Sequence, residues 1–133
     1  MSARTKARKR ALDILFESEL QGKPLGASLD ERLIENDPPV NEYSVTLIRG
    51  VQEHNAEIDE LIEQNAVDWT LTRMPGVDRN LLRIAVWEIV YGDVPPAVAV
   101  SQAVELARDL STDESPGFVN GLLSAISKAV SKP

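Results

Sequence analysis

The fold of this chain depends on residues 77–91, whose sequence is VDRNLLRIAVWEIVY. From the fifth position of this stretch onward only Arg83 and Glu88 are charged, and nearly every other position is apolar. A helix that is apolar on all sides belongs at the centre of the packing in a chain that is otherwise rich in charge. We therefore expect a central helix with Asp78 as its N-cap and an end near Tyr91.

The segments on either side of this stretch are separated by proline and glycine. In each of them apolar residues recur every three or four positions, which predicts amphipathic helices. No segment has the alternating pattern of a β-strand. Together with the central helix, these segments predict an all-α fold of six to seven helices. The other expected helices cover residues 2–20, 27–35, 42–67, 98–110 and the segment that starts at Ser115.

Pro75 and Gly76 form a turn that divides the expected helices into two sets of three. A chain of 133 residues suits one domain and is short for two. We therefore expect a single helical domain over residues 1–133, with subdomains of about residues 1–70 and 71–133.

The composition excludes several kinds of protein. Charged residues make up 26% of the chain and hydrophobic residues 43%, which allows a buried core and a polar surface. No apolar run reaches the roughly 18 residues that a membrane-spanning helix needs. The chain has no cysteine, which excludes a disulfide framework, a thiolate metal site and a thiol nucleophile.

Charge is distributed unevenly along the chain. The formal net charge is −7, from 14 Lys and Arg against 21 Asp and Glu. Residues 1–10 contain five basic and no acidic side chains, which gives +5, and residues 11–133 contain 9 basic and 21 acidic, which gives −12. This division excludes a protein that binds polyanions over its whole surface, but it allows an acidic protein with one basic end.

Few residues offer enzymatic chemistry. His54 is the single histidine, and with neighbouring glutamates it supplies too few ligands for a metal site. We expect it to be a half-buried structural side chain. A serine or threonine nucleophile would have no second histidine as a base, and no glycine-rich phosphate loop is present. We therefore expect no enzymatic activity and no metal site.

The basic end consists of Arg4, Lys6, Arg8, Lys9 and Arg10. One interpretation is a solvated helix terminus without a role, and the other is a site that binds a polyanion. The acidic remainder would repel a long duplex, so a short single strand is the more compatible ligand. Single-stranded RNA is read partly by stacking of its bases on aromatic rings. Phe16 and Phe118 are the candidates for stacking, although both have the spacing of core residues.

Three stretches together resemble the NusB family of bacterial transcription antitermination factors. They are ARKRALDILF at residues 7–16, VDRNLLRIAVWE at residues 77–88 and SPGFVNGLL at residues 115–123. The amino-acid sequences of the first and third look most like those of actinobacterial members. The resemblance covers essentially the whole chain. It implies two packed three-helix bundles and a cytoplasmic, non-enzymatic factor without a cofactor. It also implies binding to single-stranded boxA RNA of ribosomal RNA transcripts together with NusE, a small-subunit ribosomal protein, so that RNA polymerase passes terminators.

The resemblance also implies roles for particular residues. The expected RNA-binding residues are Arg4, Lys6, Arg8, Lys9, Arg10, Glu114 and Phe118, with Lys9 and Arg10 included mainly for their charge. The expected NusE-binding residues are Phe16, Asp78 and Arg83. Thr5, Pro116 and Gly117 replace basic residues of other members, which could weaken RNA contacts. The alternative function is a helical protein-interaction scaffold whose basic N-terminus is incidental, and a homodimer is also possible.

Overall fold

The structure is a computed structural model that describes residues 2–67 and 69–130. Within these residues it contains α-helices and one short 3-10 helix, η1, and no strand. The all-α prediction is therefore confirmed. The elements are α1 (Ala3–Leu20), α2 (Ser28–Glu35), α3 (Glu42–Glu53), α4 (Asn55–Asn65), η1 (Leu71–Arg73), α5 (Gly76–Val90), α6 (Pro96–Leu110) and α7 (Ser115–Val130).

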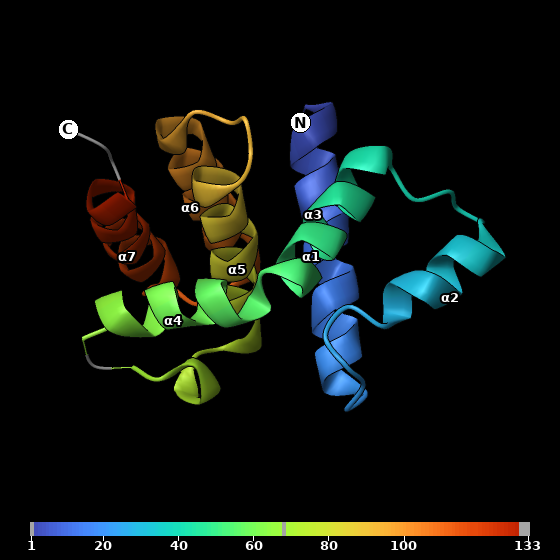
Figure 1. Ribbon diagram of the computed structural model, residues 1–133, viewed down its shortest axis with the longest axis horizontal. Helices are drawn as coiled ribbons and strands as arrows, with labels where there is room; N and C mark the ends of the chain where they lie inside the picture. Colours follow the sequence, from blue (N-terminus) through green and yellow to red (C-terminus); the bar gives the residue numbers. More distant parts are fainter. Residues whose placement is uncertain (1, 68, 131–133) are drawn as a thin grey trace.

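Helix α5 is the central element, as its sequence predicts. It packs against α1, α3, α4, α6 and α7, and its residues Leu81, Leu82, Ile84, Ala85 and Val86 are all buried. Figure 1 shows α5 grouped with α4, α6 and α7, and beside them a second group that consists of α1, α2 and α3. Burial of one large apolar side chain contributes about 1.5–3 kcal/mol, so this helix supplies much of the core.

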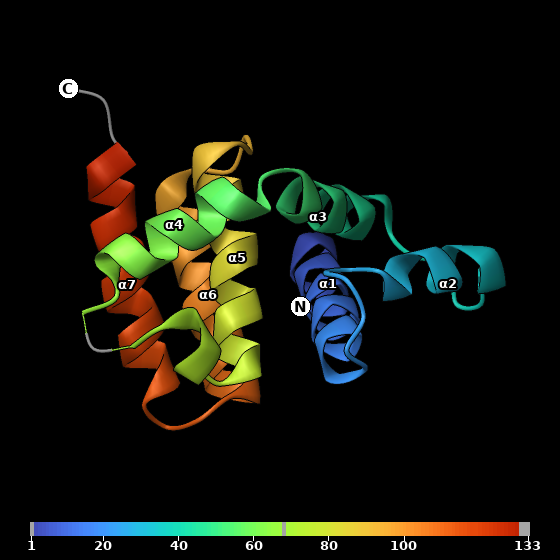
Figure 2. The same cartoon turned by 60° about the horizontal axis from the view of Figure 1, so that its bottom comes forward.

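Helix α2 lies at the periphery. It packs mainly against α1, and Figures 1 and 2 both show it projecting from the rest of the molecule. Leu29 on its inner face is fully buried, whereas Ile34 near its end is 85% exposed. This short amphipathic helix therefore packs on the rest of the molecule through one face only.

The prediction of one helix over residues 42–67 is wrong, because the chain turns at His54. Helix α3 ends at Glu53, and α4 starts at Asn55 and ends at Asn65. The turn allows α3 to pack on α1 while α4 crosses to α5 and α7 (Figure 2). His54 is half-buried, as expected, and its ring stacks on Tyr91 with centroids 3.7 Å apart.

Close packing of α3 on α5 depends on Gly50. A Cβ atom at this position would lie 2.2 Å from Nε1 of Trp87, which is far inside van der Waals contact. The absence of a side chain at Gly50 therefore lets the Trp87 indole lie directly against the backbone of α3.

Several predicted boundaries shift. Helix α5 starts at Gly76 with Pro75 as its N-cap, so Asp78 lies in the first turn and is not the cap. Helix α6 starts at Pro96, two residues earlier than expected, and Ser115 is the first residue of α7 and not its cap. By its contacts α4 belongs with α5 and α7, although the predicted subdomain boundary places it in the first subdomain.

Within the described part of the chain, no helix is both long enough and apolar enough to cross a membrane.

Candidate nucleic-acid interface

The basic end forms the first turns of α1. Ser2 caps this helix by accepting a hydrogen bond from the Thr5 backbone N–H at 3.1 Å. The Thr5 hydroxyl donates to Gln102 Oε1 at 2.6 Å, which fastens the start of α1 to α6. Of the basic side chains here, Lys6 and Lys9 are exposed to solvent and Arg10 is half-buried. A cap and a tertiary contact thus hold this segment as ordered helix.

Arg8 differs from its basic neighbours because it is buried, with 4% of its surface exposed. Its Nε lies 3.0 and 3.1 Å from the two carboxylate oxygens of Glu88, and one terminal nitrogen lies 2.9 Å from Oε2. Tyr43 donates a further hydrogen bond to the same carboxylate. The guanidinium of Arg8 is thus held in the interior through two of its nitrogens, although Arg8 also lines the groove beside Arg4. Its contact with a phosphate stays a prediction.

Tyr43 joins the basic end to this buried pair. Burial raises the pKa of the Tyr43 hydroxyl, and its hydrogen bond to Glu88 and the charge of Glu88 raise it further. The guanidinium of Arg4 lies 4.3 Å from the centroid of the Tyr43 ring, a cation–π arrangement. Arg4 also lies 3.7 Å from Asp93, but 52% of its side chain remains exposed. Arg4 is therefore oriented by its neighbours and still accessible to a ligand.

A shallow groove of about 520 Å³ lies beside Arg4, between the start of α1 and the start of α6. Its apolar wall is formed by Val94, Pro95 and Val98, and Gln102 and Asp93 supply polar groups. Arg4 therefore borders a surface that combines apolar and hydrogen-bonding groups.

Glu114 and Phe118 lie at the opposite end of α5 from the basic residues. Glu114 lines a small recess together with Asp78, which lies in the first turn of α5, whereas Arg8 contacts Glu88 near the last turn. Ten residues of helix separate Asp78 from Glu88, which corresponds to about 15 Å. The expected RNA-binding residues thus form two separate groups.

Asp78 is buried, with 2% of its surface exposed. It accepts hydrogen bonds from the hydroxyls of Ser111 at 2.5 Å and Ser115 at 2.9 Å. These bonds tie the start of α5 to the loop before α7. Asp78 therefore offers no free carboxylate to a protein partner in this conformation.

The other expected partner-binding residues, Phe16 of α1 and Arg83 of α5, lie where α5 meets α1 and α4. Phe16 is half-buried against Gly76, where an added Cβ atom would lie 2.4 Å from the Phe16 ring. Arg83 is paired with Asp59 of α4, with contacts of 2.9 and 3.1 Å. Both residues hold helices together, and neither is fully exposed.

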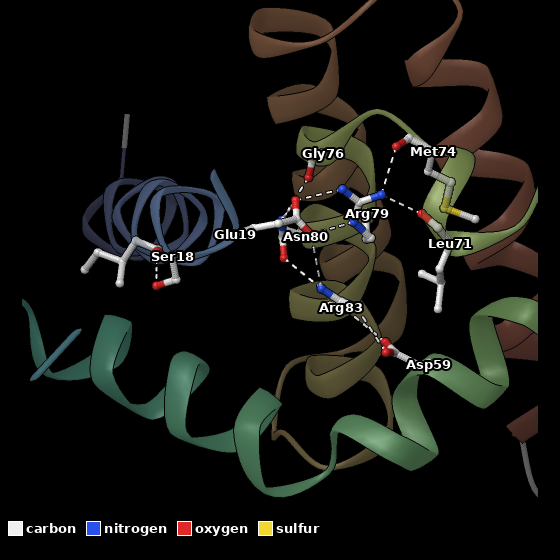
Figure 3. A network of polar contacts seen from close by, with 10 residues as sticks. Ser18, Glu19, Asp59, Leu71, Met74, Gly76, Arg79, Asn80 and Arg83 are labelled. Carbon is white, nitrogen blue, oxygen red and sulfur yellow. Dashed lines mark hydrogen bonds and ion pairs between the residues drawn. The ribbon is translucent and has the colours of Figure 1, made fainter. Parts of the chain in front are cut away.

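Glu19, to which the sequence analysis gave no role, is the centre of a polar network between α1 and α5 (Figure 3). Both of its carboxylate oxygens accept hydrogen bonds of 2.7 Å from Arg79. Burial alone would raise the pKa of Glu19, but hydrogen bonds from Arg79 and Asn80 and the charges of Arg79 and Arg83 outweigh it and lower the pKa. This contact spans 60 residues, so no local pattern reveals it.

Among the described residues, no three histidine, aspartate or glutamate side chains gather as a metal site would require. The groove at one end of α5 offers arginine side chains, and the recess at the other end offers aromatic rings and hydrogen-bonding groups. These groups suit binding of a nucleic acid or a protein.

Comparison with known proteins gives one consistent family. The family model described as "NusB family" matches residues 5–128. The transcription antitermination protein NusB of a Nocardioides species is 58% identical over 95% of this chain and 94% of its own length. That of Kineococcus radiotolerans is 55% identical, covering 96% of this chain and 95% of its own. These relatives confirm the expected actinobacterial likeness.

Solved structures agree in fold. NusB of T. maritima superposes with a TM-score of 0.83 at 35% identity, covering 96% of this chain and 92% of its own. A NusB chain from a crystal structure of the antitermination factors NusB and NusE in complex with dsRNA has a TM-score of 0.80 at 31% identity. That match covers 95% of this chain and 96% of the other. This chain therefore belongs to the NusB family of transcription antitermination proteins.

Proposed function

We propose that this protein binds single-stranded boxA RNA of ribosomal RNA transcripts together with NusE, and thereby helps RNA polymerase pass terminators. The observation that carries the proposal is the basic end of α1, where Arg4, Lys6 and Lys9 are accessible on an otherwise acidic chain. The solved relative in complex with NusE and dsRNA supports binding of NusE and of an RNA by this fold. The single-strand assignment rests on the charge division of the chain and on the resemblance to the family. The protein acts in the cytoplasm, where transcripts form, and it acts by binding and not by catalysis.

The basic residues have two different tasks in this proposal. Arg4, Lys6, Lys9 and Arg10 contact phosphates, which supplies affinity without sequence preference. Arg8 holds α1 in place through Glu88. Sequence preference then comes from unstacked bases, read by stacking and by hydrogen bonds to their edges.

The two ends of α5 divide the remaining roles. Phe118 and Glu114 lie beside the RNA at the end away from the basic residues. Phe16 and Arg83 belong to the NusE side. Asp78 contributes to that side indirectly, by holding the loop before α7 through Ser111 and Ser115.

The acidic remainder of the chain suits a basic ribosomal protein. Charge complementarity of this kind accelerates association and selects partners. A few accessible cations give weak binding alone at physiological salt, and a second protein on the same RNA raises the overall affinity.

A filter-binding experiment tests the proposal. The full chain is titrated against boxA RNA, against a scrambled strand of equal length and against a boxA duplex, each with and without NusE. We expect boxA single strand to bind best and NusE to tighten that binding. The double substitution Arg4→Ala with Lys6→Ala should weaken RNA binding about tenfold or more and leave NusE binding unchanged.

The alternative, a protein-interaction scaffold with an incidental basic end, makes a different prediction. In that case boxA and scrambled RNA bind equally poorly, and the double substitution changes nothing. Equal binding of the duplex would show that the single-strand assignment is wrong.

A further inference from the structure

Trp69 is an exposed tryptophan between α4 and α5 to which the sequence analysis gave no role. Its surface is 45% exposed, although tryptophan is among the more buried residue types on average. Its ring centroid lies 6.3 Å from that of Phe118, with the planes inclined at 57°. Phe118 is half-buried and packs against the core, and the Trp69 ring packs against it from the outside. Of the two rings, Trp69 presents the larger open face.

The recess that Trp69 and Phe118 line together is small. It has a volume of about 70 Å³. This leaves little space for a planar ring system. The inclined rings also leave no parallel slot. A planar ligand must therefore lie on the outer face of Trp69.

The two recesses beside Trp69 differ in charge: one is lined by a cation and a carboxylate, and the other by carboxylates without a cation. On one side Arg73, at the end of η1, is exposed and lines a second recess with Trp69, of about 280 Å³. Glu63 lines the same recess, but within the described residues Arg73 makes no ion pair. On the other side the exposed Glu114 lines the recess with Phe118. Of the two recesses, the one with Arg73 offers a phosphate a cation, whereas the one with Glu114 offers carboxylates that repel it.

We propose that Trp69 is a stacking platform for one unpaired RNA base, with Arg73 contacting the phosphate next to that base. This inference rests on the proposed RNA-binding function and deepens it. An exposed aromatic face beside an exposed cation is the combination by which proteins hold single-stranded nucleic acid, because every base has a face that can stack. Phe118 then supports the platform and is not the platform itself.

The test uses the full chain and a boxA oligonucleotide, with affinity measured by fluorescence anisotropy of a label on the RNA. Trp69→Leu should weaken binding about tenfold, within the range measured when a stacking side chain is removed. Trp69→Phe keeps an aromatic face and should stay within about threefold of the parent chain. Ile34→Ser, which removes an exposed apolar side chain on the distant α2, is the matched control and should leave affinity unchanged.

Salt dependence separates stacking from charge. Stacking releases no counterions, so Trp69→Leu should weaken binding without changing the slope of log affinity against log salt. Arg73→Gln should reduce the steepness of that slope by about 0.7, the value for one phosphate contact on a single strand. A variant that is only misfolded would not produce this division.

Tryptophan fluorescence gives an independent readout. RNA should quench the emission of the parent chain, and Trp69→Phe should abolish the quenching, because the remaining Trp87 is half-buried against Gly50. Equal quenching in Trp69→Phe, or unchanged affinity in Trp69→Leu while the parent chain binds boxA, would overturn this inference alone. A loss of NusE binding with intact RNA binding would instead assign Trp69 to a protein contact. A parent chain that binds no RNA would overturn the proposed function and this inference together.

Discussion

Arg8 and Arg4 show how two arginines one helical turn apart acquire different roles. Both lie on the line of Leu12 and Leu15, the buried stripe of α1. Arg4 lies at the helix end, where the stripe reaches solvent, whereas Arg8 lies where the stripe meets Glu88 of α5. A buried charge is tolerated only when it is paired and hydrogen-bonded, and Glu88 with Tyr43 satisfies that requirement.

This difference predicts the stability of alanine variants. Arg8→Ala leaves the Glu88 carboxylate buried without its cation and should cost about 3–5 kcal/mol of unfolding free energy. Arg4→Ala removes an exposed contact and should cost less than about 1 kcal/mol. Urea unfolding followed by circular dichroism measures both. Similar small losses in the two variants would contradict the structural role of Arg8.

At the scale of helices, α3 packs closely on α5 one turn before the chain changes direction. Gly50 admits Trp87 to the backbone of α3, and four residues later the chain breaks at His54 and enters α4. The break lets the same segment contribute to both helix groups. The helical spacing of apolar residues continues through the turn, and for this reason the sequence predicts a single helix over residues 42–67.

Two glycines inside helices give a matched test of this contact. Gly50→Ala places a Cβ atom 2.2 Å from Nε1 of Trp87 and should destabilise the fold by about 1–3 kcal/mol through overpacking. Gly121→Ala in α7 meets open space and should stabilise it by about 0.5–1 kcal/mol, because alanine favours helix over glycine. Thermal or urea unfolding of both variants decides the matter. A stabilised Gly50→Ala would show that α3 and α5 are not packed as described.

At the scale of the whole molecule, sequence periodicity predicts the helices well but not the contacts between them. The apolar residues from Leu81 onward identify the central helix, because burial on all sides leaves a local signature. The pairing of Arg8 with Glu88 spans 80 residues, and that of Glu19 with Arg79 spans 60, so neither leaves one. The location of Phe118 at the far end of α5 from the basic residues also follows only from packing.

The fold shows where the basic end of this otherwise acidic chain lies. The accessible cations of the first helix lie at one end of α5, and Trp69, Phe118 and Glu114 lie at the other. An RNA that reaches both ends must run along the molecule, and such a path suits a flexible single strand better than a stiff duplex. Because Arg8 is paired with Glu88, we expect Arg4, Lys6, Lys9 and Arg10 to be the phosphate contacts of this end.

The most direct test of RNA binding through the basic end is the salt dependence of boxA affinity in the parent chain and in the double variant Arg4→Ala with Lys6→Ala. Each single-strand phosphate contact contributes a slope of about −0.7, so four cations account for up to about −2.8. We predict that the double substitution makes the slope shallower by about 1.4 while the unfolding free energy stays nearly constant. A slope that is the same in both proteins, or near zero in the parent chain, would contradict binding through this end of the molecule.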